Sequence, residues 1–254
     1  MRIKTILGFI ITLLLIVTSS VYAGELPSHS ELKKILKEIV NEKNGGFSLN
    51  MWATIVDRDG VVKTVVFSGS DRGDQWPGSR AISAQKANTA NAFSLPGLPL
   101  STANLFSAVQ PGGSLYGLQH SNPVNTKTAY GGPSNKIGAK DDPMVGNKIG
   151  GVNVFGGGLA LYDENGSLLG GIGVSGDSSC ADHNIAWKVR HKLKLDYIPA
   201  GVSPTKDDNI VNDIVEGSSS GGWGHPVCAS EAAEIAKALP KTHPIRSNKQ
   251  PASN

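Results

Sequence analysis

Three histidines are the strongest candidates for chemistry in this sequence. His183 follows a glycine-rich stretch that ends at Gly176, and free backbone N–H groups at the start of a helix would attract an anionic group there. His120 lies in a long polar loop, and His225 lies three residues before Cys228. An imidazole can bind a metal ion or exchange a proton near neutral pH. These histidines are therefore our first candidates for a binding or catalytic site.

The first 23 residues are typical of a secretory signal peptide. Arg2 and Lys4 precede an apolar run from Ile6 to Val17, and Val21-Tyr22-Ala23 then offers small residues at the outer positions of a cleavage site. An uncleaved membrane anchor is the alternative, but the run is shorter than the roughly 20 residues that a spanning helix needs. We therefore expect cleavage after Ala23, a periplasmic or secreted product, and no later membrane span.

Cys180 and Cys228 are the only cysteines, and we expect them to form a disulfide. Two cysteines in one exported chain usually pair, because the compartment is oxidising. A free or metal-binding pair is the alternative. The bridge would bring His225 close to His183, so the two imidazoles are expected in one pocket.

Two familiar sequence motifs occur, but neither fits its usual context. The stretch from Gly171 to Gly176 matches G-x-G-x-x-G, with Asp196 downstream. Its glycines lie inside a hairpin strand, whereas a dinucleotide site needs them after the first strand of a parallel unit. Gly217–Gly221 matches G-x-S-x-G but lies in a Gly/Ser run without the strand and helix of a nucleophile elbow.

The hydrophobic pattern predicts one α+β domain in which helices cover an antiparallel sheet. Turn signals join the expected strands into two hairpins. The expected strands are 49–56, 61–67, 152–162 and 168–175, and the expected helices are 28–41, 80–92, 101–109, 182–195 and 229–239. The polar segment 110–151 is expected to be an ordered excursion over one face of the domain, and the end after residue 240 is expected to fray.

Composition excludes several classes of protein. Hydrophobic residues make up 39% of the chain and charged residues 18%, which is not typical of disorder. The formal net charge of +3 is too small for a protein whose main partner is nucleic acid. Two cysteines are too few for a disulfide-stapled miniprotein.

Two segments resemble the GlcG/HbpS-like family of haem-binding proteins. One is Ser79–Ala90, which contains Lys86-Ala-Asn-Thr-Ala, and the other combines Phe155–Gly158 with Leu169–Gly176 and a following Asp182. The resemblance implies a profilin-like core with a five-stranded antiparallel sheet flanked by helices, assembly into homo-oligomers, and haem or another tetrapyrrole as ligand. Some members degrade haem, so an enzymatic role is open.

The expected domain extends beyond a typical member of this family. We expect a domain over residues 24–240, with its core at about 32–195, an insertion at about 110–151, an extension at 196–240 and a frayed tail at 241–254. The insertion and the extension are departures from the family pattern, and so is the Cys180-Ala-Asp-His183 sequence.

The resemblance leads to three hypotheses for function. The first is an exported haem-binding protein for storage, scavenging or degradation, with His183, His120 or His225 as the axial ligand of the iron. Its remaining cofactor-binding candidates are Arg80, Lys86 and Arg190 near the propionates, together with Gly173 and Gly176. The second is a cofactor-independent enzyme that uses Lys86, Asp182 and His183 for acid–base work on a small organic anion. The third is a sensory or accessory subunit that binds a small ligand. Lys86 and Asp182 also have structural interpretations, as a snorkelling side chain and a helix N-cap.

Overall fold

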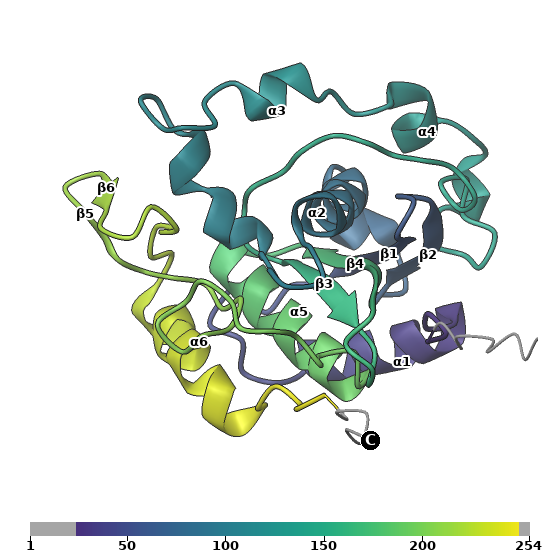
Figure 1. The fold of residues 1–254 in the computed structure, drawn as a ribbon. Coiled ribbons are helices and arrows are strands. Elements are labelled where there is room, and N and C mark those ends of the chain that lie inside the picture. Colours follow the sequence, from purple (N-terminus) through teal and green to yellow (C-terminus); the bar gives the residue numbers. More distant parts are fainter. Residues whose placement is uncertain (1–23, 249–254) are drawn as a thin grey trace, which may run out of the picture.

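The structure is a computed structural model that describes residues 24–248. Its centre is an antiparallel sheet of four strands in the order β2-β1-β4-β3 (Figure 1). The strands are β1 (Trp52–Asp57), β2 (Val62–Phe67), β3 (Gly158–Tyr162) and β4 (Leu168–Ser175). The predicted signal peptide lies outside the described residues.

Helices cover both faces of the sheet (Figure 1). Helix α2 (Ser79–Phe93) packs on one face, against β4, β1 and β3. Helices α1 (His29–Val40) and α5 (Ser179–Lys192) pack on the other face, and α6 (Ser230–Thr242) packs on α5. The predicted α+β architecture is therefore confirmed.

Alternation along β1 divides the core into two layers. Trp52 and Val56 belong to the apolar cluster under α2, while Ala53 and Ile55 belong to the cluster under α1 and α5. This is the period of two expected for a strand buried on both faces. The sheet therefore separates the α2 side of the molecule from the α5 side.

Among residues 24–248 the sheet has four strands, so the fifth strand implied by the family resemblance is not found there. After α5 the chain makes a single parallel bridge to the edge strand β3, between Tyr162 and Asp196. It leaves the edge after Asp196, and Pro199 downstream has no N–H to donate to a ladder. The extension from residue 196 instead runs toward α6.

Two predicted helices differ from the observed ones. Helix α5 begins at Ser179, three residues earlier than expected, because the Ser178 side chain accepts a hydrogen bond from the backbone of Ala181. The segment expected as one helix at 101–109 forms two short 3-10 turns, Thr102–Leu105 and Ser107–Val109. His183 therefore lies in the second turn of α5 and does not open the helix.

The insertion and the C-terminal segment are ordered where the structure describes them. Residues 110–151 include the short helices α3 (Leu118–Ser121) and α4 (Thr126–Tyr130), and they run over the side of the molecule occupied by α2 (Figure 1). Beyond α5 lie a two-stranded ribbon, β5 (Ile214–Val215) and β6 (Ser218–Ser219), and then α6. Helix α6 continues past residue 240. Among residues 24–248, no helix is long and apolar enough to cross a membrane.

Candidate functional site

The expected disulfide forms between Cys180 and Cys228, and it links α5 to the segment before α6. His225 is buried beside the bridge, and its Nε2 lies 3.3 Å from the Ser179 hydroxyl. Its Nδ1 lies 2.8 Å from the carbonyl oxygen of Pro226, so Nδ1–H is the donor and Nε2 carries the lone pair. Burial lowers the pKa of His225 to about 4.

His183 is fully buried, and its ring is held by the C-terminal extension. Its Nε2 lies 3.1 Å from both the Asn209 side-chain oxygen and the backbone nitrogen of Ile210. Its Nδ1 has no hydrogen-bond partner among the described residues. Burial lowers the pKa of His183 to about 3, so the ring is neutral. Neither nitrogen reaches solvent, and the ring contributes to packing beside Trp187.

Lys86 and Asp182 form a buried ion pair that joins the two faces of the sheet. The Lys86 ammonium lies 2.7 Å from the Asp182 carboxylate and 3.1 Å from the carbonyl of Val174. The other Asp182 oxygen accepts a hydrogen bond from the backbone of Asp177. Burial raises the pKa of Asp182 to about 6 and outweighs the attraction of Lys86. Both groups are closed off from solvent in this structure.

Arg80 holds the insertion against α2. Its guanidinium makes a bidentate ion pair with Asp142, and it donates a third hydrogen bond to the carbonyl of Ala129 at 2.8 Å. Asp142 is buried and also accepts bonds from the backbone of Gly138 and Met144. The pair therefore fixes two separate stretches of the insertion to the N-terminal turn of α2.

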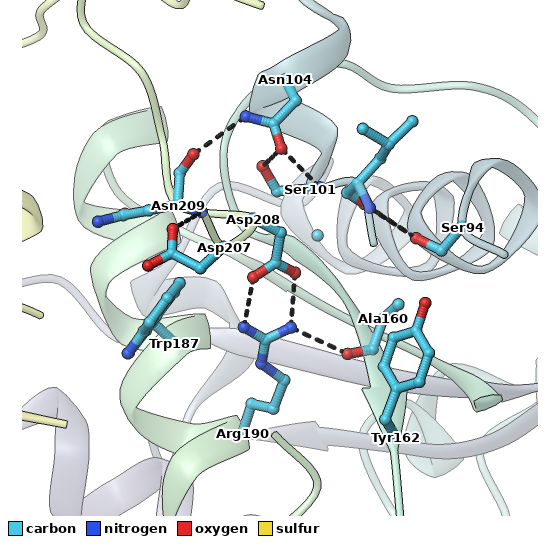
Figure 2. Close-up of polar contacts among 12 residues, drawn as sticks. Ser94, Ser101, Asn104, Ala160, Tyr162, Trp187, Arg190, Asp207, Asp208 and Asn209 are labelled. Atoms are coloured by element: carbon cyan, nitrogen blue, oxygen red, sulfur yellow. Dashed lines mark hydrogen bonds and ion pairs between the residues drawn. The ribbon is translucent and has the colours of Figure 1, made fainter. Parts of the chain in front are cut away.

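Arg190 holds the extension in the same way (Figure 2). Its two terminal nitrogens lie 2.6 and 2.7 Å from the two oxygens of Asp208, and one of them also donates to the carbonyl of Ala160. The guanidinium carbon lies 5.1 Å from the centre of the Trp187 ring. Both charged side chains are completely buried.

Figure 2 shows that this ion pair belongs to a larger polar layer between α5 and the extension. Asn209 accepts a hydrogen bond from Asn104 through its carbonyl, and Asn104 in turn accepts from Ser101. Most of the side chains predicted for cofactor binding are therefore buried and already bound to other protein groups. They are Arg80, Lys86, Arg190, His183 and His225. His120 is different, because it is exposed on α3.

Gly173 and Gly176 lie where another segment of backbone comes so close that a side chain would not fit. A Cβ at Gly173 would lie 1.9 Å from the carbonyl oxygen of Ser83 on α2. A Cβ at Gly176 would lie 2.5 Å from the carbonyl oxygen of Asn50. Gly173 therefore lets α2 approach the sheet closely, and Gly176 lets the end of β4 lie against the backbone before β1, so both have a packing role.

A cavity of about 500 Å³ lies where β1, the loop before α2 and the insertion meet. We call it the Trp52 cavity. Its walls are mostly apolar, from Trp52, Pro77, Ala81, Ala129, Tyr130 and Ile137, and it also contains Asp71, Arg72, Gly73 and Arg80. Trp52 is buried, stacks on Phe67 at 4.7 Å, and has no hydrogen-bond partner for its Nε1 among residues 24–248.

Of the residues that line this cavity, sequence reasoning named only Arg80. Trp52 is one apolar residue in a strand of them, and Tyr130 lies in an insertion without a recognisable pattern. Arg72 lies in the loop between β2 and α2, and it is exposed. The Asp71-Arg72-Gly73 turn followed by Trp76-Pro77 is the only local signal that could have pointed to them.

A second cavity, of about 420 Å³, lies between the extension and α6. Its lining includes Asn209, Ile210, Ala236 and Lys237. All of its residues lie between 203 and 240.

Comparison with known proteins gives one family and several solved structures, of which two are described here. The family described as "Haem degrading protein HbpS-like" matches residues 28–190, which confirms the resemblance seen in the sequence and agrees with haem as the expected cofactor. A PduOC:heme complex is 27% identical, with 63% of this chain and 88% of that chain covered at a TM-score of 0.43. The Klebsiella pneumoniae protein ORFY is 23% identical, with 66% and 92% covered at a TM-score of 0.42. No curated protein matches the sequence.

Proposed function

We propose, because this chain belongs to the HbpS-like family of haem-degrading proteins, that it binds haem or a closely related tetrapyrrole in the Trp52 cavity. One observation carries this choice of site. Every residue that lines the Trp52 cavity lies inside the family-matched range 28–190, whereas the second cavity is built wholly from residues beyond it.

The chemistry of the Trp52 cavity fits a flat ligand with an acidic edge. Apolar side chains can cover a macrocycle, and a volume of about 500 Å³ is within the range of small-molecule sites. The exposed Arg72 guanidinium can pair with a carboxylate such as a propionate. Arg80 is already bound by Asp142, so it shapes the wall and does not compete for that role.

Charged side chains in the wall add a second reason. Asp71, Arg72 and Arg80 also line the Trp52 cavity, whereas a simple packing defect would have apolar walls throughout.

The cavity offers one side chain of a type known to bind haem iron. Tyr130 lies in α4 and is 69% exposed, so its hydroxyl is accessible. We therefore propose Tyr130 as the first candidate for the iron ligand and the exposed His120 as the second. Ligation by His183 or His225 would require the loss of the contacts that now hold those rings. Bound haem would supply the iron chemistry on which degradation depends.

The test is a haemin titration followed by visible absorption, with variants that separate the candidates. The wild type is expected to give a saturable 1:1 shift of the Soret band. Arg72→Gln should weaken binding by about tenfold, the loss of one carboxylate-binding group. Tyr130→Phe should change the spectrum if the phenol binds iron, and His120→Ala should change it if the imidazole does.

Two kinds of control complete this experiment. Lys237→Gln alters the lining of the second cavity and should leave the titration unchanged. His183→Ala and His225→Ala report on the buried histidines. A weak, non-saturating shift that no variant alters would remove the haem proposal and leave a small organic anion as the next ligand class. Loss of the Soret band over time with an added reductant would indicate degradation.

We further propose that the protein is exported and that it forms a homo-oligomer. The signal-like first 23 residues and the disulfide both support export. N-terminal sequencing of the mature protein should begin at Gly24, and a chain that begins at Met1 would contradict this. Light scattering should give a mass that is a multiple of the monomer.

A further inference from the structure

We propose that reduction of the Cys180–Cys228 disulfide opens a zinc site formed by the two thiolates and the Nε2 of His225. The ligand atoms of these three residues all lie within 4.8 Å of one another. Around one tetrahedral zinc ion, with Zn–S of about 2.3 Å and Zn–N of about 2.0 Å, two ligand atoms lie about 3.5–3.8 Å apart. The three side chains therefore need only small movements to bind the same ion.

His225 is already oriented as a zinc ligand. Its Nδ1–H donates to the carbonyl of Pro226 at 2.8 Å, which leaves the lone pair on Nε2. Histidines that bind zinc are typically fixed by such a bond from the other ring nitrogen. Nε2 lies 3.3 Å from the Ser179 hydroxyl, which is itself 3.4 Å from the Cys228 sulfur. The lone pair thus faces the side of the ring where the sulfurs lie.

The surroundings of the sulfurs favour anionic ligands. The backbone N–H of Cys180, in the first turn of α5, donates to the Cys228 sulfur at 3.2 Å. The positive end of a helix stabilises a thiolate in this position. The Ser179 hydroxyl adds an oxygen next to both kinds of ligand. Two thiolates and one imidazole leave a fourth position open, as in zinc sites that also bind water.

A reductant can reach the disulfide, and the reduction and zinc binding balance. Cys228 is exposed while Cys180 is buried, so a dithiol or phosphine reductant can attack the outer sulfur. Two electrons and two protons convert the disulfide into two thiols, and the reductant is oxidised. Zinc then displaces both thiol protons to the solvent. The disulfide and the zinc site are therefore mutually exclusive states of one corner of the fold. This inference does not depend on haem binding.

The experiment compares oxidised and reduced protein. The purified protein is treated with a phosphine, the reductant is removed without air, and one equivalent of Zn²⁺ is added in competition with a chromogenic chelator. Reduced wild type should retain one zinc per chain, and untreated protein should retain none. His225→Asn should weaken retention by at least about tenfold. His243→Asn, which changes a histidine away from the bridge, should behave as wild type.

A second readout keeps the result clear if the reduced protein loses structure. Zinc, but not Mg²⁺, should protect both cysteines of the reduced wild type from alkylation and should preserve or restore its far-UV circular dichroism. Zinc retention that is equal in His225→Asn and wild type would overturn the proposal, because thiols alone would then account for it. Failure of zinc either to be retained or to restore the fold would overturn it as well.

Discussion

At the scale of residues, charged side chains that look reactive in the sequence act as internal clamps. Lys86 is paired with Asp182 across the end of the sheet, and Arg190 is paired with Asp208 in the extension. A buried charge is tolerated only when a partner compensates the loss of hydration. These pairs therefore specify which segments come together, and removal of one partner is predicted to be more harmful than removal of both.

Lys86→Met tests this directly. The substitution leaves the Asp182 carboxylate buried without its counter-ion, so the free energy of unfolding is expected to fall by about 3–5 kcal/mol. The double variant Lys86→Met/Asp182→Leu removes both charges and should be closer to wild type than either single variant. Urea denaturation of the four proteins gives the coupling energy. Additive effects of the two substitutions would show that the pair has no clamping role.

His183 should make stability depend on pH. Its pKa is lowered to about 3 in the folded protein, below the value of about 6.5 in an unfolded chain. Between these values the unfolded chain binds a proton that the folded protein does not. The free energy of unfolding therefore falls as pH is lowered from about 6.5 toward about 3, by up to ~1.4 kcal/mol per pH unit from this group.

His183→Gln should make that dependence shallower by up to the same slope, measured by urea denaturation at several pH values. The exposed His120→Gln is the matched control and should leave the slope unchanged. A slope that is identical in wild type and His183→Gln would contradict the assignment of a neutral, buried ring.

At the scale of elements, α2 lies close to the sheet because β4 has glycines, Gly171 and Gly173, where it faces this helix. A Cβ at Gly173 would lie 2.4 Å from the backbone nitrogen of Ala87, in addition to its clash with Ser83. Gly173→Ala is expected to lower stability by about 1–3 kcal/mol, or about 2–4 °C in Tm for each kcal/mol. Gly97→Ala is the control, because nothing lies within 4 Å of its Cβ position. Equal melting temperatures would contradict the close approach.

The insertion should loosen when its anchor is removed. Asp142→Asn removes the charge that compensates the buried Arg80, and so it should release residues 126–144 from α2. Limited tryptic cleavage after Lys127, Lys136 or Lys140 is expected to become faster. Asp141→Asn is the neighbouring control, because its pair with Lys136 is exposed and contributes little. Equal cleavage rates in the two variants would contradict the anchoring role.

The elements that could be predicted are those specified by local signals. Helix α1 follows from its apolar spacing, and both hairpins follow from their turns. The sequence predicts the start of α5 three residues too late because Ser178 and Asp182 are both plausible caps, and only the structure shows which one accepts the bond. The fifth strand was carried over from the family, and this chain leaves the sheet edge after Asp196.

At the scale of the whole molecule, the extension completes the fold. The family match ends at residue 190, and the partner of Arg190 lies beyond it at Asp208. A chain that ends at Leu195 is therefore expected not to fold, because it loses Asp208, the Asn209 contact to His183 and the disulfide. Asp208→Asn should reproduce part of the loss in the full chain. Near-UV circular dichroism would measure the tertiary packing of the shortened chain and of Asp208→Asn. A spectrum of the shortened chain with the signals of a packed interior would contradict the prediction.

The candidate site was only partly accessible from the sequence. The disulfide could be predicted from compartment and cysteine count, and it brings His225 to the start of α5 as expected. The Trp52 cavity could not be predicted, because its residues come from a strand, a loop and the insertion, which only the folded chain brings together. Burial is the second obstacle, since a sequence does not reveal that Lys86 and Arg190 have no access to solvent.

The ion pair between Arg190 and Asp208 also limits when the chain can complete its fold during synthesis. A chain that emerges from its N-terminus exposes the arginine before its partner, which follows 18 residues later, and Cys180 waits for 48 residues until Cys228 arrives. Domains tend to fold as their residues emerge. Here the family core can collapse early, but it lacks both links until residue 228 has been synthesised. A product that terminates before Asp208 therefore carries the Arg190 charge without the carboxylate that compensates it in the folded chain.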